Sequence, residues 1–112
     1  MQRVTIDCSR IRDRRSFHDV FAEALGFPEF YGRNMDAWID CVSDLDQGSG
    51  LTNVRLSVGE TLLLELRGAS GFHARMPELS RLLLECVAIV NGRSGDDAGV
   101  PRPTALVAVA WA

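Results

Sequence analysis

FPEFYGRNMDAWIDCVSDL, residues 27–45, combines an aromatic loop with a helix that has two distinct faces. Asn34 is expected to cap this helix, because its side-chain oxygen can accept a hydrogen bond from the free N–H groups of the first turn. Gly32 would permit a positive φ in the approach to the cap. Apolar residues then recur three or four apart and predict a buried face: Met35, Trp38, Val42 and Leu45.

The second face of this helix is acidic. Asp36, Asp40 and Asp44 recur four apart, and like charges at that spacing destabilise a helix by about 0.2–0.5 kcal/mol per pair. No arginine or lysine occurs between Arg33 and Arg55, so no neighbour in the sequence neutralises the stripe. Two interpretations remain open, a solvated surface or a surface kept for a cationic partner.

The composition is typical of a small globular protein. With 112 residues, 46% of them apolar and 24% charged, the chain is expected to form one domain, residues 1–112, with its own core. Cys8, Cys41 and Cys86 lack metal-binding spacing, which indicates reduced thiols and a cytoplasmic location. No apolar run approaches the ~20 residues of a membrane span, and none marks a signal peptide.

Alternating and periodic apolar residues predict the remaining elements. The expected strands are Val4–Cys8, Thr61–Leu66 and Ala105–Val109, with a weaker edge strand over Val54–Val58. One expected helix begins at Asp13 or Ser16 and stops at Gly26, and another runs from Pro77 to Gly92. Between them, residues 69–76 are expected to form a short turn or a one-turn helix. Strands separated by helices pair in parallel with right-handed crossovers. We therefore predict an α/β fold, a three-stranded parallel sheet packed with three to four helices. The conformations of loops 47–59 and 92–103 do not follow from the sequence.

Residues suited to catalysis or metal binding are few. There is no glycine-rich phosphate loop and no GxSxG. His18 is expected at the surface of a helix and His73 in a turn, neither with metal-ligand spacing. An enzyme using Cys41 or His73 is the weakest alternative, and we expect no cofactor, no metal and no catalytic residue.

Four arginines between Arg10 and Arg15 form a small basic cluster. A nucleic-acid patch would normally interleave such residues with aromatic ones, and this cluster has none, so a solvated turn is the favoured interpretation. We accordingly expect no direct contact with nucleic acid and none with a membrane.

Residues 28–45 resemble the signature of the barstar family, the intracellular inhibitors of barnase-type ribonucleases. The family pattern is an aromatic–glycine loop, an asparagine cap, then an aspartate, a tryptophan and a second aspartate followed by cysteine or a small residue. The matching positions are Phe30, Tyr31, Gly32, Asn34, Asp36, Ala37, Trp38, Asp40 and Cys41. Outside this segment the likeness is mainly one of element order.

The resemblance implies a function. In the family, the loop and the second helix block the ribonuclease active site, so Asp40 would enter the basic phosphate-binding site in place of an RNA phosphate. Asp36 would contact neighbouring arginine or lysine residues, and Phe30 would stack on the rim of the active site. The residues expected to contact a basic, secreted-type ribonuclease are Phe30, Tyr31, Gly32, Asn34, Asp36, Ile39, Asp40, Ser43, Asp44 and Glu85.

The sequence departs from the family pattern at several positions. Phe30 stands where the family has a loop tyrosine, and Ile39 replaces the tryptophan before the second aspartate in the best-known members. Glu85 is the candidate for a further acidic contact from the helix before the last strand. These departures leave the target nuclease open, and the alternative is a barstar-like interaction or regulatory module without a nuclease partner.

Overall fold

The computed structural model describes residues 1–93 and 105–112, and the predicted loop 92–103 lies outside this range from residue 94 onward. Its elements in chain order are β1 (Gln2–Asp7), a 3-10 turn η1 (Cys8–Arg10), α1 (Arg14–Leu25), α2 (Met35–Ser43), β2 (Leu62–Arg67), α3 (Ala69–Arg75), α4 (Pro77–Gly92) and β3 (Val107–Trp111). The predicted helix order is confirmed, with residues 69–75 forming a helix of their own.

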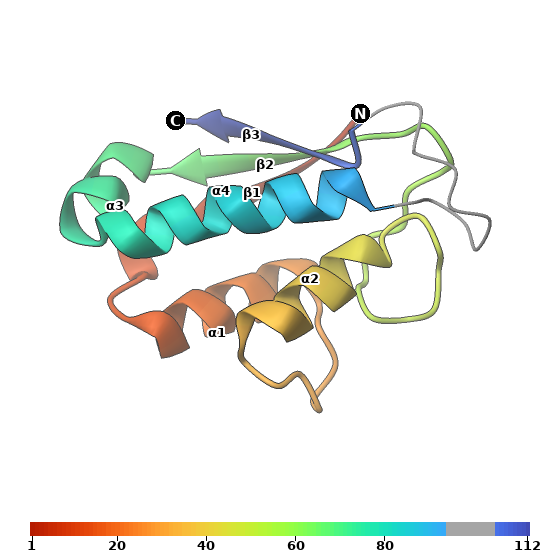
Figure 1. Cartoon of the computed structure of the whole chain (residues 1–112), viewed down its shortest axis with the longest axis horizontal. Helices are drawn as coiled ribbons and strands as arrows, with labels where there is room; N and C mark the ends of the chain where they lie inside the picture. Colours follow the sequence, from red (N-terminus) through yellow and green to blue (C-terminus); the bar gives the residue numbers. More distant parts are fainter. Residues whose placement is uncertain (94–104) are drawn as a thin grey trace.

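The three strands form one parallel sheet in the order β1-β2-β3. Val4 pairs with Leu64, and Leu64 with Val109. Alternate residues such as Leu62, Leu64 and Leu66 are buried, as expected when one face of a strand packs on helices. In Figure 1 the helices lie on one side of the sheet, with α4 next to it. The predicted α/β fold with three parallel strands is therefore confirmed.

The strand predictions need correction. Strand β1 spans Gln2–Asp7 rather than Val4–Cys8, and β2 spans Leu62–Arg67 rather than Thr61–Leu66. The last strand begins at Val107 rather than Ala105. Residues 54–58 form no strand, although Val54, Leu56 and Val58 alternate with polar residues. Leu56 is the only one of the three that is buried, and its N–H donates to the carbonyl of Leu45 at 2.8 Å. This segment therefore ties the end of α2 to the core instead of extending the sheet.

Helix α1 begins and ends where its flanking residues predict. The carboxylate of Asp13 accepts a hydrogen bond from the N–H of Ser16 at 2.7 Å, so Asp13 is the cap. Gly26 follows the helix with φ 67°, a left-handed conformation that glycine adopts without steric cost. The helix then gives way to the aromatic loop that leads into α2.

Helix α2 packs against α4 through its apolar face. Trp38 is fully buried, and its ring meets that of Phe21 of α1 edge to face, with 5.6 Å between centroids. The expectation that Trp38 belongs to the core is confirmed. Because the apolar face packs against α1 and α4, the opposite face of α2 is exposed to solvent (Figure 1).

Candidate functional site

The loop between α1 and α2 is fixed by buried aromatic residues on both sides of one exposed ring. Phe27 and Tyr31 are 9% and 6% exposed, and their ring centroids lie 4.7 Å apart. The N–H of Tyr31 donates to the carbonyl of Pro28 at 2.9 Å and closes a turn. Phe30 lies inside this turn and is 79% exposed. An exposed aromatic ring on a fixed turn suits a binding surface, because aromatic side chains are enriched among interface hot spots.

His18 anchors the same loop from α1. Its Nδ1 lies 2.5 Å from the hydroxyl of Tyr31, and the His18 side chain is buried. The prediction of a surface position for His18 is therefore wrong, because the loop folds back and covers this face of the helix. Burial, reinforced by the positive charges of Arg14 and Arg33, lowers the pKa of His18. Burial also raises the pKa of Tyr31, so a neutral imidazole faces a protonated phenol.

The His18–Tyr31 contact predicts a pH dependence of stability. The pKa of His18 in the folded protein lies below its ordinary value of 6.5, so the unfolded chain binds more protons in mild acid. The contribution of His18 to stability is then complete above pH 6.5 and is lost as the pH falls toward the folded-state pKa. We expect the free energy of unfolding, measured with urea, to fall between pH 7.5 and 5.0, and to fall less in His18→Gln.

An exposed histidine provides the control for this measurement. His73→Gln is the matched control, because it makes the same substitution at an exposed position of α3. Asp7 and Asp13 have lowered pKa values because of hydrogen bonds from Ser9 and Ser16. Their contribution to stability is lost only below about pH 3.8, outside the range tested. Equal slopes for His18→Gln and the parent protein would refute the assignment to His18.

The start of α2 is held by a cap and an ion pair. The Oδ1 of Asn34 accepts a hydrogen bond from the N–H of Ala37 at 2.8 Å, which confirms the predicted cap. The positive φ expected at Gly32 occurs instead at Arg33, with φ 49°. The Nε of Arg33 donates to Asp19 of α1 at 2.9 Å. Gly32 has a steric role, because a Cβ there would lie 3.1 Å from the Asn34 amide nitrogen.

Two carboxylates of the predicted stripe face solvent. Asp36 and Asp40 are exposed on α2, and Glu85 is exposed on α4. Burial, followed by the charges of Glu85 and Asp36, raises the pKa of Cys86. Both carboxylates therefore act on the same thiol at the contact between α2 and α4. We call the exposed set Phe30, Asp36, Asp40 and Glu85 the acidic–aromatic face.

Asp40 has a cationic neighbour that is distant in the sequence. A terminal nitrogen of Arg93, which follows α4, donates to the Asp40 carboxylate at 3.2 Å and to the Ser43 hydroxyl at 3.5 Å. The two charged side chains remain 46% and 66% exposed. An exposed pair of this kind contributes about 0–1 kcal/mol. The stripe is thus neutralised in part, and the pair is weak enough for a partner to break.

Asp44 does not belong to the outward acidic face, contrary to the prediction. Helix α2 ends at Ser43, and Asp44 is its C-terminal cap, 7% exposed. Its carboxylate accepts hydrogen bonds from the N–H groups of Ser49 at 3.1 Å and Leu51 at 3.2 Å. The negative charge of Asp44 therefore organises the following loop, because it satisfies two backbone donors at once.

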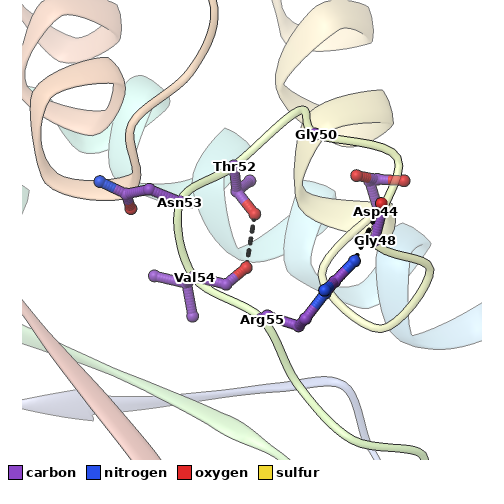
Figure 2. Close-up of a pocket in the computed structure, with 7 residues that line it drawn as sticks. All are labelled: Asp44, Gly48, Gly50, Thr52, Asn53, Val54 and Arg55. Atoms are coloured by element: carbon purple, nitrogen blue, oxygen red, sulfur yellow. Dashed lines mark hydrogen bonds between the residues drawn. The ribbon is translucent and has the colours of Figure 1, made fainter.

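That loop surrounds a hollow of about 270 Å³, whose lining includes Asp44, Gly48, Gly50 and residues 52–55. Figure 2 shows two hydrogen bonds within this loop. The guanidinium of Arg55 donates to the carbonyl of Gly48, and the hydroxyl of Thr52 donates to the carbonyl of Val54. Within the described residues, these contacts hold the loop together and bring no nucleophile and base side by side.

The remaining predicted contact residues occupy supporting positions. Ile39 and Tyr31 are 6% exposed, and Ser43 is partly buried. In this arrangement the backbones of these residues position the acidic–aromatic face, while their side chains mostly serve the core. Sequence spacing alone could not separate the two groups, because Ile39 and Asp40 are adjacent and Tyr31 follows Phe30 directly. A role for each in binding a partner stays a prediction.

An enzymatic site receives little support from the described residues. Burial raises the pKa of the Cys41 thiol, with Asp40 and Asp44 adding to the effect, and this disfavours the thiolate needed for attack. His73 lies 2.5 Å from the hydroxyl of Ser80, which is itself buried and donates to the carbonyl of Pro77.

The described residues carry neither a candidate metal site nor a helix that could span a membrane. Residues 1–93 and 105–112 contain no group of three or more His, Cys, Asp or Glu side chains placed to hold a metal ion. Over that described part of the chain, each helix is too short or too polar to cross a membrane.

Comparison with known proteins gives two findings. A family model described as Barstar (barnase inhibitor) matches residues 1–102. A protein of Bacillus subtilis (strain 168) named "Putative ribonuclease inhibitor YrdF" is 37% identical over 43 residues, which are 38% of this chain and 47% of that protein. The alignment thus covers less than half of the relative. Because the family model spans nearly all of the 112 residues, this chain belongs to the barstar family.

Proposed function

We propose that this protein inhibits a barnase-type ribonuclease by inserting its acidic–aromatic face into the active site. The observation that carries the proposal is the exposure of Asp36 and Asp40 on a helix that is capped by Asn34 and anchored by buried Trp38. A ribonuclease must present cationic side chains to the phosphates of RNA. Carboxylates on a rigid helix compete for those side chains with little loss of conformational entropy.

Each residue of the face has a distinct part in the proposal. Asp40 takes the place of a phosphate, and Asp36 and Glu85 contact basic side chains around it. Phe30 packs on the rim of the active site, since its ring is exposed while its flanking residues are fixed. The support for these roles is the exposure of all four side chains and the family membership of the chain.

The test combines capture with an activity assay. Immobilised protein is used to capture basic ribonucleases from the secreted proteins of the native host, and the captured nuclease is assayed for RNA cleavage with and without free inhibitor. We expect stoichiometric inhibition that weakens as salt rises, because screening weakens contacts between exposed charges. The double variant Asp36→Ala/Asp40→Ala is the matched control and should not inhibit. A partner captured through the same face but without ribonuclease activity would refute the proposal and favour the regulatory-module alternative.

A further inference from the structure

We propose that Arg93 is an internal competitor for the cationic group that a partner places on Asp40. The proposal rests on the proposed function and adds an element of regulation to the same surface. Arg93 lies 53 residues from Asp40 in the sequence, yet its guanidinium contacts both Asp40 and Ser43. A cationic side chain of the protein itself thus occupies the outer face of α2.

Arg93 occupies the position beside Asp40 and Ser43 that a cationic group of a partner would take. Asp40 and Ser43 are three residues apart on α2, so their side chains lie on the same side of the helix. One nitrogen of Arg93 donates to both, at 3.2 and 3.5 Å. The carboxylate and the hydroxyl therefore form a two-point acceptor for one guanidinium nitrogen. A partner's arginine or lysine that approaches Asp40 meets this position already filled.

The backbone of Arg93 is fixed while its side chain is exposed. Its N–H donates to the carbonyl of Val90 at 3.2 Å, as the C-terminal cap of α4. The side chain is 46% exposed, so it can move aside without disturbing the helix. Displacement by a partner breaks the exposed pair with Asp40, and exposed ion pairs are weak. Until it moves, the positive charge of Arg93 repels a second cation. Affinity is therefore lowered, and partners that supply several cations are favoured over those that supply one.

The first test measures the Kd of the ribonuclease for Arg93→Ala. Removing the competitor should lower Kd by about two- to fivefold at low salt, the range that corresponds to an exposed ion pair. Arg3→Ala is the matched control. Arg3 pairs loosely with Glu65 on the sheet, at 3.7 Å, so its removal changes the net charge equally at a remote site. In an Asp40→Ala background, Arg93→Ala should bring no gain.

Three results would overturn the proposal. A Kd that rises in Arg93→Ala would show that Arg93 positions Asp40 for the partner. An equal gain in Arg3→Ala would assign the effect to overall charge. An unchanged Kd in Arg93→Ala would show that Arg93 does not occupy this position in solution.

A second test needs no ribonuclease and separates this proposal from the proposed function. A hexa-arginine peptide is titrated into the protein, and binding is followed by NMR through the backbone amides of Asp40 and Ser43. Saturation at lower peptide concentration in Arg93→Ala than in the parent protein supports competition, even if no ribonuclease is found to bind. Inhibition of a ribonuclease together with weaker or unchanged peptide binding in Arg93→Ala would leave the proposed function intact and refute the competitor.

Discussion

Replacing Asp40 by alanine is expected to weaken ribonuclease binding by more than ~2 kcal/mol, about thirtyfold in Kd. The same change should alter the free energy of unfolding by less than about 1 kcal/mol. The side chain is 66% exposed and its ion pair with Arg93 lies on the surface, so the fold loses little. The partner, in contrast, would retain a desolvated cation without its counter-charge, which is costly. Titration calorimetry and urea unfolding on the same samples give the two quantities.

Asp44→Ala is the matched control, because it removes the same charge one helical turn away. Its carboxylate is buried and accepts hydrogen bonds from Ser49 and Leu51. Its loss leaves two backbone donors without their acceptor and should lower the free energy of unfolding by about 1–3 kcal/mol. We expect a much smaller change in Kd than for Asp40→Ala. The opposite result would be that Asp44→Ala weakens binding as strongly as Asp40→Ala and leaves stability unchanged. That result would contradict the assignment of Asp44 to loop stability and of Asp40 to partner binding.

The contrast between Asp40 and Asp44 shows which features of α2 can be predicted from the sequence. Helical spacing predicted α2 and the burial of Trp38 on its apolar face, and the cap at Asn34 followed from a contact between residues three apart. Spacing also put Asp44 on the acidic stripe. The helix, however, ends at Ser43, and the next residue turns inward to meet a loop whose conformation the sequence did not reveal. A carboxylate's direction at a helix end is decided by the donors that fold around it.

The other differences have the same origin in long-range contacts. His18 is polar on an otherwise apolar helix face, and it becomes a core residue only because Tyr31 supplies a hydrogen-bond partner from the following loop. Arg93 reaches Asp40 from the far end of α4. Local periodicity contains no information about either pairing. Strand positions were off by one or two residues for a related reason, since the register of β3 is fixed by its pairing with β2.

Replacing Trp38 by alanine is expected to have the opposite effect to Asp40→Ala, a loss of about 3–5 kcal/mol in the free energy of unfolding. Trp38 is fully buried and packs edge to face on Phe21, so alanine would leave a cavity between α2 and its neighbours. The loss is comparable with the whole stability of many small domains. The midpoint of urea unfolding should therefore fall steeply, while any protein that remains folded should bind the ribonuclease with nearly unchanged Kd.

Trp38→Phe separates the contribution of ring packing from the effect of the buried indole N–H. The indole Nε1 is buried and has no hydrogen-bond partner within residues 1–93 and 105–112, and an unsatisfied buried donor costs about 1–3 kcal/mol. Phenylalanine removes this donor and keeps an aromatic ring against Phe21, so we expect it to lose less than half as much stability as alanine. Equal destabilisation by both variants would mean that the indole N–H is satisfied in solution. The stability of α2 would then depend on that hydrogen bond as well as on packing, and the position of Asp40 would depend on it too.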